Sequence, residues 1–235
     1  MPAMSCSLYN VILETSLENL RLRLENINLE EPTEAFGEPY TLRTIISDLY
    51  WGMERDLLWG TLSFETLQVV PQISGRPTCT LAGNRVRFCL FHGAISLYLA
   101  IFANRGRAEK AATKMNHVLT RGNDVPSQIV FNRRISTTIL EQFLNNHPHT
   151  KKMCGWRDLD FVGVSKSSLH GANLDQFDHT REYDSHGSKR YIMVELHDIG
   201  TTIRISDEGI VTFFGNVTEE DALGLIRNEI ISLLD

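Results

Sequence analysis

The side chains best suited to chemistry stand close together in one polar segment, residues 170–186, which reads HGANLDQFDHTREYDSH. Carboxylates and imidazoles at this density can hold a divalent metal, and a bound metal can activate water for hydrolysis. Their spacing follows neither the HExxH pattern nor an EF-hand loop. The same residue types also build solvated loops and loops that become ordered on a partner, so all three interpretations stay open. The candidate metal ligands are Asp175, Asp178, His179, Asp184 and His186.

Lysine and arginine form a second set of candidates, because they occur in close pairs that can contact phosphate groups. One pair, Arg133 and Arg134, falls between a predicted strand and a predicted helix, where helix amides can also meet a phosphate. No aromatic residues alternate with the pairs, as a platform for single-stranded nucleic acid requires. Solvated surface explains such pairs equally well. The candidate nucleic-acid contacts are Arg105, Arg107, Arg133, Arg134, Lys151, Lys152, Lys189 and Arg190.

Patterns for nucleotide binding and nucleophilic catalysis are missing from the sequence, since GxxxxGK[ST], GxGxxG and GxSxG do not occur. Cys154 follows His147 and His149, but no residue that would orient a base can be assigned there. Glu195 and His197 share one face of a predicted strand, where a polar surface explains them as well as a site does. We therefore predict no cofactor, with a divalent metal as the alternative.

Composition sets the broad class of the protein. The chain has 235 residues, a formal net charge of −6, and four scattered cysteines without a CxxC pair. This predicts reduced thiols in a cytoplasmic protein and no overall attraction to nucleic acid or anionic membranes. The most apolar window, residues 88–103, is shorter than a membrane span and has a predicted turn at its centre, and the N-terminus lacks the pattern of a signal peptide. We expect no membrane association.

The clearest predicted elements lie at the end of the chain. Residues 191–197 alternate as a half-buried strand does, and 202–206 and 210–214 form a hairpin in which Gly209 supplies the turn. Thr218 is the predicted N-cap of a helix whose apolar residues recur at three- and four-residue steps.

The same kinds of pattern predict the elements in the rest of the chain. Predicted strands cover residues 8–14, 57–70, 85–91, 95–102, 128–132 and 159–164, and 17–29 fits a helix or a strand. Predicted helices cover residues 41–53, 105–119 and 136–145. Predicted loops cover residues 30–39, 146–155 and 165–189, with a domain boundary at 121–126.

This order of elements predicts an α+β protein of two similar half-domains, residues 1–122 and 127–235. Each half-domain is expected to be an antiparallel sheet with helices packed on one face, and the second carries the long polar loop at 165–189. The other face of such a sheet can remain open to water or to a partner.

The text RISDEGIVTFFGNVTEEDALGLIRNEIISLL at 204–234, together with the duplicated order of elements, resembles the TATA-binding-protein-like fold. The resemblance implies a saddle-shaped sheet, which in TATA-binding proteins grips the minor groove of DNA with phenylalanine wedges. This chain departs from that pattern because it is acidic and none of its phenylalanines matches a wedge position. The fold is therefore expected, and no functional residue is carried over.

Taken together, the sequence predicts a non-catalytic binding or scaffold subunit of an intracellular multi-subunit assembly. A protein subunit is the expected partner, with nucleic acid contacted locally. The alternative is a metal-dependent hydrolase or nuclease that uses the segment 170–186.

Overall fold

A computed structural model describes residues 3–53, 55–73, 75, 77–121, 126–147, 150–171, 174 and 177–235. The chain forms two compact units. Unit 1 contains Met1–Tyr9, Gly93–Ser96 and Asn132–Asp235, and unit 2 contains Asn10–His92 and Leu97–Phe131. Antiparallel strands dominate both units, with helices added to them, so the architecture is α+β. Of the predicted boundary at 121–126, residues 122–125 lie outside the described residues.

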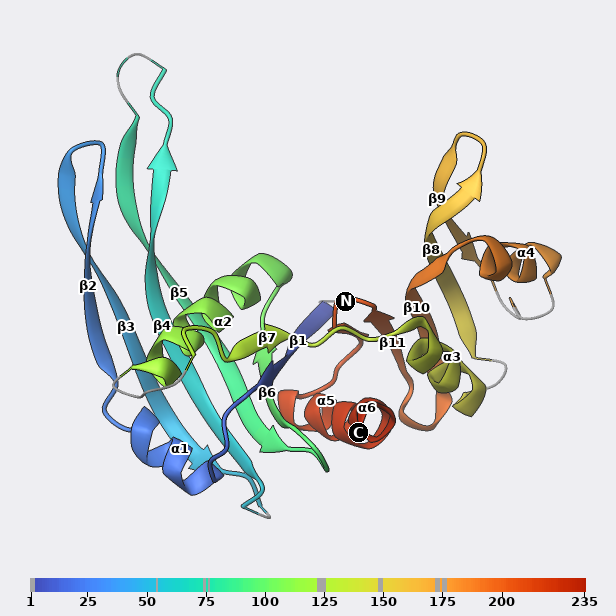
Figure 1. Ribbon diagram of the computed structural model, residues 1–235, viewed down its shortest axis with the longest axis horizontal. Helices are drawn as coiled ribbons and strands as arrows, with labels where there is room; N and C mark the ends of the chain where they lie inside the picture. The colour runs from blue at the N-terminus through green and yellow to red at the C-terminus, as the bar shows by residue number, and fades with distance from the viewer. Residues whose placement is uncertain are drawn as a thin grey trace. The chain divides into compact units, whose positions relative to one another are not determined.

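Unit 2 is built on five antiparallel strands in the order β2-β3-β4-β5-β6. Two long hairpins extend beyond the helices of this unit (Figure 1). The strands are β2 (Asn28–Ala35), β3 (Glu38–Trp51), β4 (Leu57–Val70), β5 (Thr78–His92) and β6 (Leu97–Phe102). The predicted strands 57–70, 85–91 and 95–102 are therefore confirmed, and the apolar window 88–103 is a strand pair.

Two helices pack on one face of the unit 2 sheet. They are α1 (Leu17–Leu24) and α2 (Arg105–Thr120), whose N-caps Ser16 and Asn104 accept hydrogen bonds from backbone amides in the first turn. The buried side of α2 is rich in alanine, which lets the helix approach the strands closely, and α2 lies in front of β4 and β5 in Figure 1. The predicted helix 105–119 is confirmed.

The predictions for residues 30–39 and 41–53 are wrong. They form the β2–β3 hairpin, which turns at Phe36 and Gly37 with φ of 53° and 81°. The apolar residues of 41–53 also fit helical spacing, but Thr44 and Ile46 are buried while the intervening Ile45 is exposed. Pairing with β4 over residues 44–51 satisfies the backbone hydrogen-bonding groups of this segment. Tertiary context therefore overrides the local helical spacing.

Unit 1 is a sheet in the order β1-β12-β11-β10-β8-β9, again antiparallel at β1–β12, β12–β11, β11–β10, β10–β8 and β8–β9. The strands are β1 (Ala3–Val11), β8 (Lys151–Phe161), β9 (Val164–His170), β10 (Ser188–Leu196), β11 (Thr201–Ser206) and β12 (Ile210–Phe214). A short strand, β7 (Val130–Asn132), lies where the chain passes from unit 2 into unit 1.

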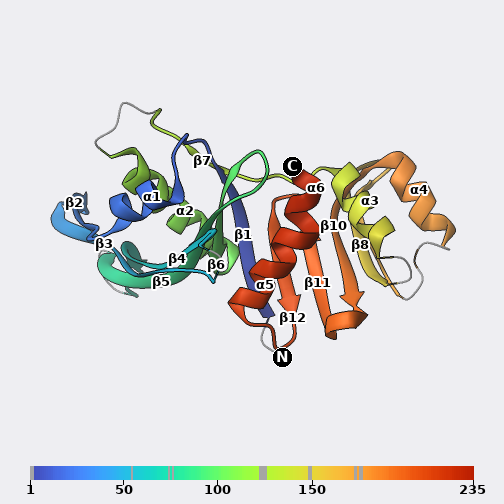
Figure 2. The ribbon, with the colours of Figure 1, turned by 90° about the horizontal axis from the view of Figure 1, so that it is seen from below.

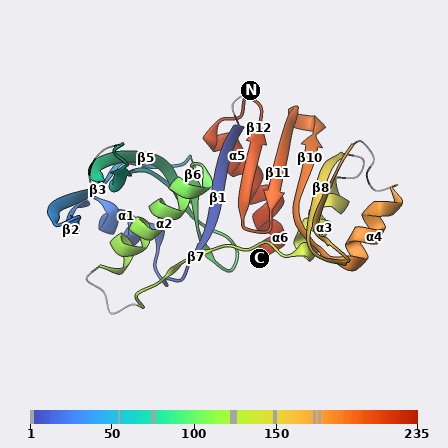
Figure 3. The ribbon, with the colours of Figure 1, turned by 90° about the horizontal axis from the view of Figure 1, so that it is seen from above.

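Helices cover one face of the unit 1 sheet. In Figure 2, α3 (Thr137–Asn146) and the C-terminal helix stand in front of the strands, and in the opposite view of Figure 3 the strands stand in front. The C-terminal helix runs from α5 (Glu219–Leu225) through the π-helix η3 (Ile226–Ile231) into α6 (Ser232–Leu234). A 3-10 turn, η2 (His197–Ile199), follows β10.

The terminal predictions are confirmed. Gly209 has φ of +74° in the β11–β12 turn, and the Thr218 side chain accepts a hydrogen bond from the amide of Asp221. The predicted helix 136–145 is also confirmed, with Ser136 as its N-cap. Among the residues that the structure describes, none of the helices has the length and hydropathy needed to cross a bilayer.

The predicted polar loop at 165–189 is wrong. This segment contains β9, the helix α4 (Asp178–His186) and the start of β10, and β8 also takes up part of the loop predicted at 146–155. The inward side of α4 carries Thr180, Tyr183 and Asp184, of which Tyr183 and Asp184 contact Trp156 in β8. Because this inward face is polar or aromatic, the segment lacks the apolar periodicity by which a helix is recognised from sequence.

Candidate functional site

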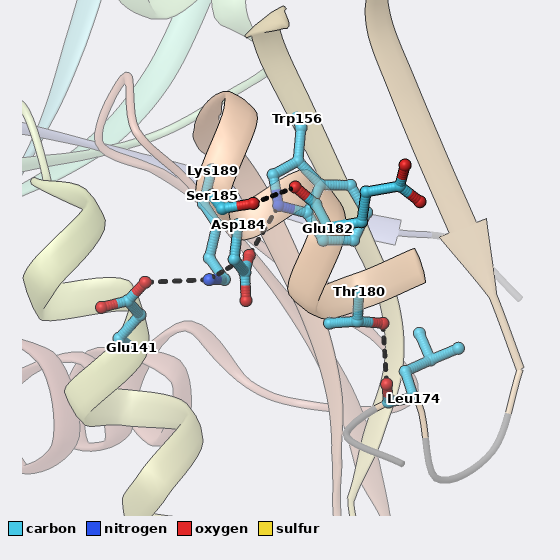
Figure 4. Close-up of polar contacts among 8 residues, drawn as sticks. All are labelled: Glu141, Trp156, Leu174, Thr180, Glu182, Asp184, Ser185 and Lys189. Carbon is cyan, nitrogen blue, oxygen red and sulfur yellow. Dashed lines mark hydrogen bonds and ion pairs between the residues drawn. The ribbon is translucent and has the colours of Figure 1, made fainter. Parts of the chain in front are cut away.

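A partly buried ion-pair network joins α4 and α3 to the unit 1 sheet (Figure 4). The Lys189 ammonium lies 2.9 Å from a carboxylate oxygen of Glu141 in α3 and also donates to Asp184 in α4. The same Asp184 oxygen accepts a hydrogen bond of 2.7 Å from the indole Nε1 of Trp156. The Lys189 side chain is only 3% exposed, so its charge is satisfied inside the protein.

The electrostatics of the network favour the charged form of Lys189. Burial lowers the pKa of an ammonium, but the hydrogen bonds to Asp184 and Glu141 outweigh that effect, and the pKa of Lys189 is raised above its ordinary value. Asp184, a predicted metal ligand, and Lys189, a predicted nucleic-acid contact, are thus brought together in a structural ion pair. Sequence spacing alone gave no sign of this.

The other predicted metal ligands face different protein partners. His179 Nδ1 lies 2.9 Å from Glu182, and His186 Nδ1 lies 2.7 Å from Asp160 at the end of β8. Asp178 is exposed in the first turn of α4, and Asp175 lies outside the described residues. Within the described part of the chain, no group of three or more His, Cys, Asp or Glu side chains is arranged to hold a metal ion.

The predicted nucleic-acid contacts divide into buried and exposed groups. Lys151 and Lys189 are buried, at 4% and 3% exposed. Lys152 is exposed and lies 2.7 Å from Glu195. Arg105 and Arg107 are exposed at the start of α2, where Arg105 pairs with Glu109 at 2.8 Å.

Two predicted contacts, Arg134 and Arg190, have their charges near Asp207 in the β11–β12 turn. A third, Arg133, meets the turn only through its backbone, because its guanidinium donates to the carbonyl of Leu234 at 3.0 Å. The Asp207 amide donates to the carbonyl of Arg190, and the Asp207 carbonyl accepts from Ile135, next to Arg134. The Arg133 carbonyl packs against Gly209 in the same turn. Arg157, which sequence reasoning missed, pairs with the Asp207 carboxylate at 2.9 Å.

Asp207 lies at the centre of this arginine cluster. Its burial raises the pKa of its carboxyl above the ordinary value, although Arg157, Arg190 and Arg134 each act to lower it. An acidic group therefore occupies the position at which the arginines meet, together with the neighbouring Glu208. The local excess of positive charge is small.

A second surface of functional interest was missed from sequence, and we call it the open face of unit 2. It is the side of β3, β4 and β5 that faces away from α1 and α2, and the strand register places its residues on one side. It presents apolar, aromatic and basic side chains, and its exposed members are Arg43, Ile45, Tyr50, Val69, Leu81 and Arg85.

A row of stacked rings supports this face. Tyr50, which is 39% exposed, stacks on Trp59 with ring centroids 6.3 Å apart, and Trp59 stacks on Phe102 at 5.5 Å. The Arg87 guanidinium lies over both Tyr50 and Trp59 and donates to the Tyr50 hydroxyl. The exposed phenol is therefore held in one position by the Trp59 ring and the Arg87 guanidinium beside it.

The open face was missed because residues 41–53 were predicted to be a helix. The available signal was the β-branched run of Thr44, Ile45 and Ile46, which favours a strand. With the strand assigned, period-2 alternation would have placed Ile45 and Arg43 on the same side.

No protein-family model matches this chain, and no curated protein sequence matches it.

Proposed function

We propose that this protein is a non-catalytic binding or scaffold subunit of an intracellular multi-subunit assembly. Its principal partner is another protein, which binds the open face of unit 2, and nucleic acid is contacted only locally. The observation that carries the proposal is the exposed Tyr50 held by Trp59 and Arg87 on the sheet face opposite α1 and α2.

The chemistry of this face is that of a protein interface. Tyrosine and arginine are enriched among residues that dominate binding energy, and a side chain already fixed in the free protein loses little entropy on binding. Ile45, Val69 and Leu81 add apolar area on the same side of the strands. A partner with an apolar centre and a rim of mixed charge would complement it.

Charge balance favours a protein over nucleic acid at this face. Arg43 lies 3.1 Å from Glu30, and Arg85 lies 3.0 Å from Asp48. A phosphate backbone requires a net excess of basic groups, because its affinity comes largely from displaced counterions. Basic groups already paired with carboxylates supply little of that excess.

Nucleic acid has a more limited place in the proposal. The exposed Arg134 and its neighbours at the β11–β12 turn can reach individual phosphates, and Lys152 pairs with Glu195. The internal duplication of the chain and its likeness to the TATA-binding-protein-like fold remain part of the proposal. Four free cysteines support the proposed cytoplasmic location.

The alternative function, a metal-dependent hydrolase or nuclease, finds less support. Its candidate ligands Asp184, His179 and His186 each contact a different protein partner. A site of that kind would need these groups to leave those contacts.

The proposal is tested by capturing the partner with the tagged chain from the native cell and measuring its affinity after purification. Ile45→Asp combined with Leu81→Asp places charge on the open face, and we expect binding at least ten-fold weaker. Val162→Asp is the matched control, because Val162 is an exposed apolar residue in unit 1. Equal affinity of both variants would show that the partner binds elsewhere and would end the proposal.

A further inference from the structure

A cleft of about 350 Å³ in unit 1 is distinct from the surfaces already described. It lies between the end of α3, the end of β10 with η2, and the C-terminal helix. Figure 2 shows α3, β10 and the C-terminal helix beside one another. Its volume is at the lower end of the range for small-molecule sites. Its polar lining includes His147, Glu195, His197 and Glu229, and its apolar lining is Leu196, Ile199 and Leu225.

Backbone and side-chain hydrogen bonds fix one wall of the cleft. The Thr150 hydroxyl donates to the carbonyl of His147 at 2.7 Å, and the Glu195 amide donates to the carbonyl of Thr150 at 3.0 Å. These bonds join the end of α3 to the end of β10. The cleft is therefore present before any ligand arrives, which reduces the entropy lost on binding.

A π-helix forms the facing wall. The Ser232 amide donates to the carbonyl of Arg227, five residues back, and the π segment spans Ile226–Ile231. Such segments are rare and often occur at functional sites. Leu225 precedes this segment and Glu229 belongs to it, and both line the cleft.

Two carboxylates line the cleft, and each has a basic group beside it. Glu195 lies 2.7 Å from Lys152, and the hydrogen bond and positive charge of that lysine lower the pKa of Glu195, which keeps it ionised. Glu229 accepts a hydrogen bond of 3.2 Å from Nε2 of His147. Lys152 itself is outside the lining, and the described lining residues include two carboxylates and neither lysine nor arginine.

We propose that this cleft binds a small organic cation. The carboxylates of Glu195 and Glu229 contact its ammonium or guanidinium group, and Leu196, Ile199 and Leu225 contact its aliphatic part. This ligand class fits the site because its cationic group can pair with the two carboxylates and its aliphatic part can pack on the apolar floor. A simple alcohol lacks the charge, and a hydrocarbon lacks any polar group. A divalent metal is a poorer fit, because the described residues contain no three-ligand group for one.

The test uses the full chain and three probes of matched length: 1,4-diaminobutane, 1,4-butanediol and succinate, all at constant ionic strength. Calorimetry and thermal unfolding are recorded for each. We expect saturable binding and a higher melting temperature with the diamine, and no effect of the diol or succinate. Binding of succinate in place of the diamine, or binding of neither, would overturn the proposal.

Substitutions of cleft residues test whether the cation binds there. Glu195→Gln and Glu229→Gln are each expected to weaken diamine binding at least ten-fold, while Glu34→Gln, on an exposed position of β2, leaves it unchanged. Ile199→Ala tests the apolar floor and is expected to weaken diaminobutane more than methylamine. Unchanged binding in both cleft glutamine variants would place the cation elsewhere and refute the assignment. The result is independent of the protein partner proposed for unit 2.

Discussion

The ammonium of Lys189 in β10 lies 2.9 Å from the carboxylate of Glu141 in α3, although the lysine side chain is only 3% exposed. Together with Asp184 this pair joins α3, α4 and the sheet of unit 1. The polar segment 170–186, which suggested chemistry, thereby acquires a structural role through Asp184.

Replacing Lys189 tests that role. Lys189→Met removes the shared cation but keeps most of the side-chain volume. We expect a loss of about 1–3 kcal/mol in unfolding free energy. This is below the usual cost for a fully buried pair because both carboxylates are partly exposed. Urea denaturation measures it. Lys166→Met, at an exposed position of β9, is the control and is expected to change stability by less than about 0.5 kcal/mol. Equal effects would show that the network contributes nothing.

The same pair predicts a dependence on alkaline pH. Because the pKa of Lys189 is raised in the folded state, its contribution is complete below the ordinary value of 10.5 and is lost as pH rises through the folded-state pKa. The stability difference between wild type and Lys189→Met should be constant near neutrality and decrease only in strongly alkaline solution. A difference that disappears between pH 6 and 8 would contradict this assignment.

Asp207 and Asp48 predict opposite responses to acid. Burial raises the pKa of Asp207, so its ionised form costs stability, and that cost is relieved as pH falls from neutrality toward 3.8. Hydrogen bonds from Ser47 and Thr61 lower the pKa of Asp48, so its contribution is lost as pH falls through the folded-state value. The unfolding free energies of Asp207→Asn and Asp48→Asn are measured between pH 3 and 7 and compared with wild type. As pH falls, the difference from wild type should change in opposite directions for the two variants. If the two stability differences change with pH in the same direction, the directions assigned to the pKa shifts of Asp207 and Asp48 are wrong.

Alanine substitutions at two glycines distinguish the stability cost of backbone strain from the cost of close packing. A Cβ on Gly209 would lie 2.0 Å from the carbonyl oxygen of Arg133, whereas a Cβ on Gly200 would meet nothing within 4 Å, and both residues have positive φ. We expect Gly200→Ala to cost about 1 kcal/mol and Gly209→Ala at least about 2 kcal/mol, since only the latter must also move backbone. Denaturant midpoints measure the difference. A larger loss for Gly200→Ala would show that the β11–β12 turn is not packed as described.

Metal addition distinguishes the proposed binding role from the hydrolase alternative. We expect Mg²⁺, Mn²⁺ or Zn²⁺ to leave the melting temperature unchanged, because Asp184, His179 and His186 contact separate partners. A rise in melting temperature that Asp178→Ala combined with His179→Ala abolishes would favour the alternative.

Several features follow from the sequence because local chemistry determines them. Asn104 and Ser136 cap their helices through bonds to amides three residues away, and Gly209 permits the turn between β11 and β12. A short stretch of chain contains all the atoms involved, so these elements can be predicted without a partner.

Other features depended on tertiary structure. Residues 41–51 fit helical spacing but form a strand because β4 pairs with them, and the inward face of α4 is polar because Asp184 meets Trp156 and Lys189. The burial of Lys189, the stacking of Trp59 on Tyr50 and the pairing of the cleft carboxylates all depend on residues distant in sequence. The free energy of a charge or a ring is set by what surrounds it, and only the folded chain supplies those surroundings.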